Sequence, residues 1–175
     1  KTLTEDQLLK AQAIAEELKE DHSGNLYSNN AAFWMAKLAV ERGDLDEASA
    51  ELEWVVDNKA NKGVELIARL RLAQVQYSQK EFEKALTTLD NVKAGAFEAS
   101  YNELRGDIYF AQAKVDSAVE AYGKAIADSG TSQNSRREII QMKIDNAKAG
   151  MNQSASTDTN SSEPQKNTEN TEAES

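Results

Sequence analysis

Small residues recur in this sequence in pairs that are twelve positions apart, and this pattern most constrains the fold. A larger residue follows four positions after the second member of each pair. A small residue on each of two helices lets their backbones approach closely, while the larger residue fills the gap to the next pair. The pattern therefore predicts helical hairpins stacked in a row. The three units are Ala36–Ala48 with Leu52, Ala73–Ala85 with Leu89, and Gly106–Ala118 with Tyr122.

The residues around these pairs favour helices from end to end. Ala, Leu, Glu, Lys and Gln dominate the first 149 residues, and the only proline is Pro164. The stretch Thr4-Glu5-Asp6-Gln7 has the form of a capping box, and Asp44 is suited to cap a later helix. Further helix boundaries are expected at Gly24, Gly43, Gly63, Ser135 and Gly150. We predict an all-α domain over residues 1–150, with about three hairpin repeats and one capping helix at each end.

Residues 151–175 differ from the rest of the chain in composition. They contain Ser, Thr and Asn in abundance, no aromatic residue, and more acidic than basic side chains. Such a segment buries too little apolar surface to offset the entropy that ordering removes. The sequence predicts a separate, disordered acidic tail.

Charge and residue types argue against several classes of function. The formal net charge is −10, whereas nucleic-acid binding requires a basic surface. Cysteine is absent, which excludes disulfides, thiolate catalysis and cysteine-based metal sites. The single histidine, His22, lies in a polar stretch, and no glycine-rich phosphate loop occurs. We predict a protein that is not an enzyme and that has no catalytic, cofactor or metal site.

The three units resemble the tetratricopeptide repeat, or TPR. The third unit matches best, because Gly106, Tyr109, Ala118, Tyr122 and Ala125 fall where that family places glycine, tyrosine, alanine, an aromatic residue and alanine. The first two units depart from it at the tyrosine position. The resemblance implies a curved stack of helices whose concave face is lined by the first helix of each unit.

A narrower resemblance is to the periplasmic domain of the YfgM family. It rests on "LRLA" at 70–73, "LRG" at 104–106 and "QMKI" at 141–144, and it extends over about residues 4–147. Members of that family are ancillary subunits of the bacterial SecYEG translocon. The resemblance implies an inner-membrane protein whose domain faces the periplasm. It implies protein partners, namely the SecYEG translocon, a PpiD-type chaperone and unfolded client proteins.

The chain begins at Lys1, and we expect it to be a piece of a longer protein whose membrane anchor precedes it. Two other functions fit a TPR domain: a different envelope adaptor or assembly factor, and a cytosolic adaptor. The residues before Lys1 would separate them. An uncleaved apolar helix indicates the translocon subunit, a cleaved signal or a lipid-attachment cysteine indicates the other envelope adaptor, and an initiator methionine indicates the cytosolic one.

The repeat register also predicts which side chains face the concave surface. They lie three positions before, one after and four after the first small residue of each unit. Such a surface suits a helix or an extended peptide, although burial under the terminal helices is an alternative. Lys37 stands almost alone there as a cation, so a clamp for a peptide carboxylate is not expected. The predicted partner-binding residues are Phe33, Lys37, Val40, Leu70, Gln74, Tyr77, Glu103, Asp107 and Phe110. Trp34 and Trp54 are candidates either for partner binding or for packing between helices.

Overall fold

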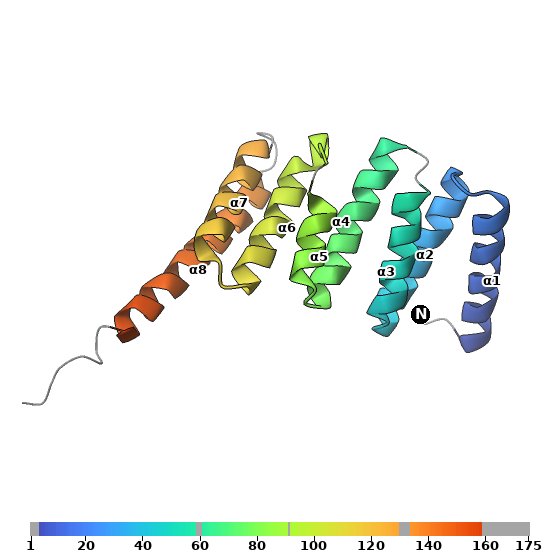
Figure 1. The fold of residues 1–175 in the computed structure, drawn as a ribbon, viewed down its shortest axis with the longest axis horizontal. Coiled ribbons are helices and arrows are strands. Elements are labelled where there is room, and N and C mark those ends of the chain that lie inside the picture. The colour runs from blue at the N-terminus through green and yellow to red at the C-terminus, as the bar shows by residue number, and fades with distance from the viewer. Residues whose placement is uncertain (1–3, 59–60, 91, 130–133, 159–175) are drawn as a thin grey trace, which may run out of the picture.

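The chain folds into a row of helices in which each element packs against its neighbours in the sequence (Figure 1). The computed structural model describes residues 4–58, 61–90, 92–129 and 134–158, with side chains as far as Ala149. All regular elements in these ranges are helical, as the sequence predicts. In order they are α1 (Glu5–Asp21), α2 (Leu26–Arg42), α3 (Leu45–Asp57), α4 (Lys62–Ser78), α5 (Phe82–Leu89), the 3₁₀ turn η1 (Gly95–Phe97), α6 (Glu98–Ala111), α7 (Val115–Asp128) and α8 (Asn134–Asp158).

The three predicted hairpins are α2–α3, α4–α5 and α6–α7. In each hairpin the two small residues of the repeat are buried where the helices meet, and the larger residue four positions later is buried beside them. Helix α1 packs against α2 and helix α8 packs against α7, so both act as the capping helices that the sequence predicts. The buried small residues are Ala36, Ala48, Ala73, Ala85, Gly106 and Ala118.

All three hairpins turn through the same backbone conformation. The residue seven positions after the first small residue has a positive φ: 81° at Gly43, 63° at Lys80 and 58° at Ala113. In all three turns the N–H of this residue donates to the carbonyl three positions before it, and the N–H of the next residue donates to the carbonyl five positions before it. This is the hydrogen-bond pattern of a Schellman motif. This identity confirms the repeat register. Only the first unit has the glycine that favours this conformation. For any other residue, adopting it costs about 1–2 kcal/mol.

The predicted capping box at the start of α1 is present. The Gln7 amide N–H donates to the Thr4 hydroxyl, and the Thr4 amide N–H donates to the Gln7 side chain. Asp44 caps α3 by accepting the Glu47 amide N–H. Asn61, and not Gly63, caps α4, because its side-chain oxygen accepts the Val64 amide N–H.

The predictions for the ends of the last helix were wrong. Ser135 lies inside α8, which begins at Asn134, and Gly150 does not end the helix, which continues to Asp158. A glycine in a helix costs only about 1 kcal/mol, so its neighbours can carry the helix through it. The helical part of the chain therefore extends beyond the predicted boundary at residue 150. The remainder of the predicted tail lies outside the described residues.

Tyr101 joins the second and third hairpins. Its side chain is fully buried, and its hydroxyl donates a 2.8 Å hydrogen bond to the Leu66 carbonyl of α4. Burial raises the pKa of Tyr101 to about 12, so the hydroxyl stays protonated and remains a donor at physiological pH. This bond fixes α6 against α4 and so positions the concave face of the stack.

Candidate protein-binding groove

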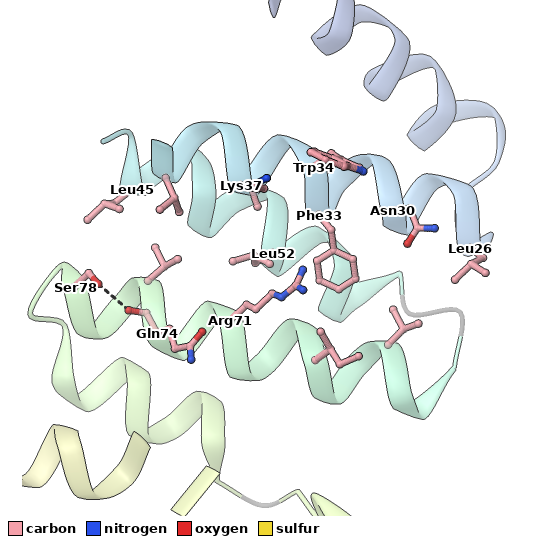
Figure 2. A pocket seen from close by; sticks show the side chains of 15 residues that line it. Leu26, Asn30, Phe33, Trp34, Lys37, Leu45, Leu52, Arg71, Gln74 and Ser78 are labelled. Carbon is pink, nitrogen blue, oxygen red and sulfur yellow. Dashed lines mark hydrogen bonds between the residues drawn. The ribbon is translucent and has the colours of Figure 1, made fainter. Parts of the chain in front are cut away.

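A groove of about 840 Å³ separates α2 from α4, and residues of α3 form its floor (Figure 2). It follows both helices along most of their length, from Leu26 and Val64 at their N-terminal ends to Val40 and Ser78 near their C-terminal ends. Apolar side chains make up most of its lining. Because pockets of this size and lining commonly bind ligands, the groove is the candidate site.

Aromatic and cationic side chains occupy the middle of the groove. The Arg71 guanidinium carbon lies 4.7 Å from the centre of the Phe33 ring, and the Lys37 Nζ lies 4.8 Å from a ring centre of Trp34. Trp34 is 61% exposed and Val40 is 46% exposed. A partner could therefore bury substantial apolar area here.

Four of the nine predicted partner-binding residues line this groove: Phe33, Lys37, Val40 and Gln74. Phe110 is 41% exposed but does not line it. The remaining four residues have partners inside the domain. This groove therefore brings together four of the nine predicted residues.

Leu70 and Tyr77 pack beside the hydrophobic core that α4, α5 and α6 share. The ring of Tyr77 lies 5.9 Å from that of Phe82 in α5, centre to centre. Both side chains are only partly exposed. Their placement matches the alternative that the sequence left open, namely packing inside the domain, although α5 and α6 provide it and not the terminal helices.

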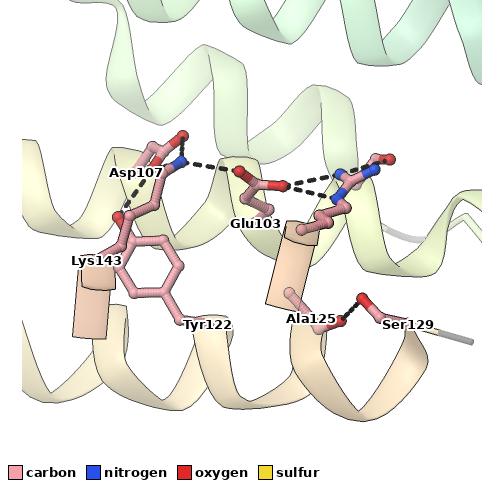
Figure 3. A network of polar contacts seen from close by, with 8 residues as sticks. Glu103, Asp107, Tyr122, Ala125, Ser129 and Lys143 are labelled. Carbon is pink, nitrogen blue, oxygen red and sulfur yellow. Dashed lines mark hydrogen bonds and ion pairs between the residues drawn. The ribbon is translucent and has the colours of Figure 1, made fainter. Parts of the chain in front are cut away.

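Glu103 and Asp107 of α6 face α8 and bind two of its cations (Figure 3). The Lys143 Nζ lies 2.9 Å from a Glu103 oxygen and 2.8 Å from an Asp107 oxygen. Arg136 contacts Glu103 at 2.8 Å. The Tyr122 hydroxyl of α7 donates a 2.8 Å hydrogen bond to Asp107. These carboxylates therefore connect three helices.

The pKa values within this network follow from burial and pairing. Burial disfavours the ionised Glu103 carboxylate, but hydrogen bonds and charge from Lys143 and Arg136 outweigh burial and lower its pKa. Burial likewise disfavours charged Lys143, and the two carboxylates outweigh burial and raise its pKa. Burial and the bond to Asp107 raise the pKa of Tyr122. Glu103, Lys143 and Tyr122 therefore keep their ordinary charge states at neutral pH.

Two central residues of the groove were missed from the sequence. Trp34 was considered but not assigned to the concave face, and Arg71 was not considered at all. Both stand two positions before the first small residue of their unit, a position that the predicted register did not include. Adding that position would have found both. With Arg71 opposite Lys37, the groove holds two cations where the sequence indicated one.

The groove lining combines apolar side chains with two cations. Its lining has no histidine, aspartate or glutamate. Elsewhere in the described parts of the chain, no three His, Cys, Asp or Glu residues lie close enough together to hold a metal ion. No helix in those ranges is both long and apolar enough to span a bilayer. The geometry therefore supports an interaction surface for another polypeptide.

Comparison with known proteins gives a family and several relatives. The family model described as "Tetratricopeptide repeat-like domain" matches residues 1–149. A protein of Neisseria gonorrhoeae is 29% identical over 131 residues, which are 75% of this chain and 62% of the relative. One of Escherichia coli is 30% identical over 122 residues, covering 70% and 58%. One of Haemophilus influenzae is 29% identical over 134 residues, covering 77% and 64%. All three are named "Ancillary SecYEG translocon subunit", and this chain spans about three fifths of their length.

Proposed function

The chain belongs to the tetratricopeptide repeat-like domain family, and on that premise we propose that it is a non-enzymatic, protein-binding subunit of the bacterial Sec translocon. The helical domain faces the periplasm, and the protein associates with the inner membrane through a segment outside this chain. It works there with a PpiD-type chaperone on proteins that are leaving the translocon.

The relatives support the first part of this proposal. Proteins from several bacteria carry the same name, and each aligns with most of the helical domain. Because this chain spans only part of their length, its role in the translocon is inferred through the domain alone. The TPR fold supports the second part, since stacked hairpins provide an extended concave surface for binding other polypeptides.

The groove between α2 and α4 is the observation that carries the proposal. It exposes Trp34 and Val40 beside two cations, and aromatic anchors of this kind dominate binding energy at protein interfaces. The same face at α6 is bridged to α8 by ion pairs. Partner binding should therefore depend on the first two hairpins more than on the third.

The test is crosslinking in native membranes of the full-length natural protein, followed by mass spectrometry. The variant Trp34→Ala with Val40→Ser removes the exposed anchors of the groove. The control, Ile139→Ala with Met142→Ala, removes apolar side chains of similar exposure from α8. We expect recovery of the translocon and its chaperone to fall about tenfold or more in the groove variant, on the scale of interface hot spots, and to persist in the control.

Circular dichroism of both variants should match that of the natural protein, because the replaced side chains are largely exposed. Full recovery of the translocon by a folded groove variant would show that another surface binds it. Recovery of cell-wall or outer-membrane assembly factors in place of the translocon would favour the different envelope adaptor.

A further inference from the structure

The groove differs in charge from the domain that contains it. The chain has 30 acidic and 20 basic side chains, yet the groove lining includes Lys37 and Arg71 and no carboxylate. Charge of one sign gathered in a cleft focuses the local field and favours ligands of the opposite sign. The groove is therefore a positively charged site on an acidic protein.

Neither cation is neutralised by a strong ion pair. No carboxylate among the described residues pairs with Arg71, whose contact is with the Phe33 ring. Lys37 lies 3.6 Å from Glu41, but the two side chains are 59% and 57% exposed, and pairs of that kind contribute little. Both cations thus retain donors for a carboxylate that enters the groove.

The cations lie midway along the groove, with apolar side chains on both sides of them (Figure 2). Leu26 and Val64 line one end, and Val40 and Leu45 line the other. A helix rises 1.5 Å per residue, so the distance along α2 from Leu26 to Val40 is about 21 Å, or about four helical turns. A ligand that fills this length meets apolar, then cationic, then apolar surface.

We propose that the groove binds an amphipathic partner segment of about four helical turns whose acidic side chains lie between two apolar groups. This rests on the proposed function only in that the ligand is a protein. The central carboxylates pair with Lys37 and Arg71. The flanking apolar side chains cover the two ends of the groove, which are lined by Leu26 and Val64 and by Val40 and Leu45. Charge therefore sets the register of the segment, and apolar burial supplies most of the affinity.

Two other occupants fit the groove less well. A C-terminal carboxylate bound between the cations would end the ligand at mid-groove and leave half of the apolar lining uncovered. The chain's own residues 159–175 are acidic, but their only apolar side chains are Pro164 and Ala173. A segment without larger apolar side chains cannot cover the groove walls.

Two synthetic helical peptides of about fourteen residues would test the proposal. They share the same leucines on one face and differ only in carrying Glu or Lys at two central positions, and both are amidated at the C-terminus. Fluorescence anisotropy against the full chain measures Kd. We expect the Glu peptide to bind at least about tenfold more tightly than the Lys peptide, with a ratio that falls as salt rises.

The two tryptophans locate the bound peptide by NMR. Trp34 lines the groove, whereas Trp54 lies against Lys19 of α1 and does not line it. The indole N–H signal of Trp34 should shift on titration with the Glu peptide, and that of Trp54 should not.

A charge-reversed variant separates the groove from the overall charge. Lys37→Glu with Arg71→Glu should reverse the preference, so that the Lys peptide binds more tightly. The control Lys84→Glu with Lys124→Glu makes the same change in net charge at lysines that are 67% and 60% exposed on α5 and α7, away from the groove. It should keep the preference of the natural chain.

Equal binding of the two peptides, binding of neither, or an unchanged preference in the charge-reversed variant would overturn the proposal. A several-fold gain in affinity on ending the chain at Asp158 would also overturn it, by showing that the chain's own tail fills the groove. The titrations use the chain alone, so their outcome is independent of whether membranes yield the translocon.

Discussion

The first and third hairpins use the same positions of the repeat for opposite purposes. Phe33 and Lys37 in α2 correspond in register to Glu103 and Asp107 in α6. The two carboxylates are bridged to the neighbouring helix α8 by Lys143, at distances of 2.8–2.9 Å. Phe33 and Lys37, in contrast, face α4 across a groove of about 840 Å³.

This difference shows what a repeat register fixes and what it leaves to individual side chains. The register decides which positions face the next helix of the stack. Whether that face is closed depends on whether the next helix brings complementary groups. At α6 it does, because Lys143 and Arg136 of α8 pair with Glu103 and Asp107. We call this closed contact the junction. At α2 the facing groups are a cation and an aromatic ring, and an open surface remains.

The largest expected effect comes from the residue beneath the closed junction. A Cβ on Gly106 would lie 2.4 Å from Tyr122 ring carbons, so Gly106→Ala must displace that ring and its bond to Asp107. We expect a loss of about 1–3 kcal/mol in the free energy of unfolding, measured by urea denaturation. Gly123→Ala is the control, because nothing lies within 4 Å of its added Cβ and alanine favours the helix.

A second variant shows whether the clash with Tyr122 is the cause. The first two units pair Ala36 with Leu52 and Ala73 with Leu89 where the third pairs Gly106 with Tyr122. Combining Gly106→Ala with Tyr122→Leu recreates their pairing and should recover part of the lost stability. A double variant that is no more stable than Gly106→Ala alone would mean that the backbone, and not the ring, requires glycine.

The next effect comes from opening the junction itself. Lys143→Met keeps the packing of the side chain but leaves Asp107 without its cation and Glu103 with Arg136 alone. Because these groups are only half-buried, we expect a loss of about 1–2 kcal/mol, less than for a fully buried pair. Lys124→Met removes an exposed lysine paired with Glu120 and should change stability by less than about 0.5 kcal/mol. Equal effects of the two variants would show that the junction contributes no more than a surface pair.

The pH dependence of stability should differ in sign between the two ends of the stack. The folded state lowers the pKa of Glu103 below 4.5, so its contribution is complete above the unfolded pKa and is lost as pH falls through the folded one. The disadvantage of Glu103→Gln should therefore grow, to about 1 kcal/mol, as pH rises from about 3 through 4.5, and should then stay constant up to about pH 7.

Glu51, which pairs with Lys19 of α1, should behave in the opposite way. Burial raises its pKa more than Lys19 lowers it, so ionisation as pH rises above 4.5 reduces the stability of the folded state. Relative to the natural chain, Glu51→Gln should become more favourable over the same pH range. Thermal unfolding across that range measures both variants, and curves of the same sign would contradict the difference.

The smallest effect is expected at the open groove. Arg71→Met removes the cation over Phe33 but leaves an apolar stem along the groove wall. The contact is exposed, so the loss should be about 0.5–1 kcal/mol, measured by the same denaturation. A loss as large as that of Lys143→Met would mean that Arg71 holds α4 to α2, and that the groove is a structural junction like the other.

Sequence alone predicted the all-helical architecture, the three hairpins and their register, because these depend on local periodicity. Ala36, Ala73 and Gly106 mark the close helix contacts through size alone. The positive-φ turns at Lys80 and Ala113 were not predicted, because no glycine marks them. Helix ends were less certain, since Gly150 carries only a small energetic penalty inside α8.

Only the tertiary structure decided which part of the concave face stays open. Glu103 and Asp107 look like groove residues until α8 brings Lys143 against them from some forty residues away in the chain. Arg71 and Trp34 share one repeat position, but only the separation of α2 and α4 in the structure shows that this position lines a groove. Periodicity is a property of one helix, whereas closure requires complementary groups on two helices, and their separation is set by the packing of the whole stack.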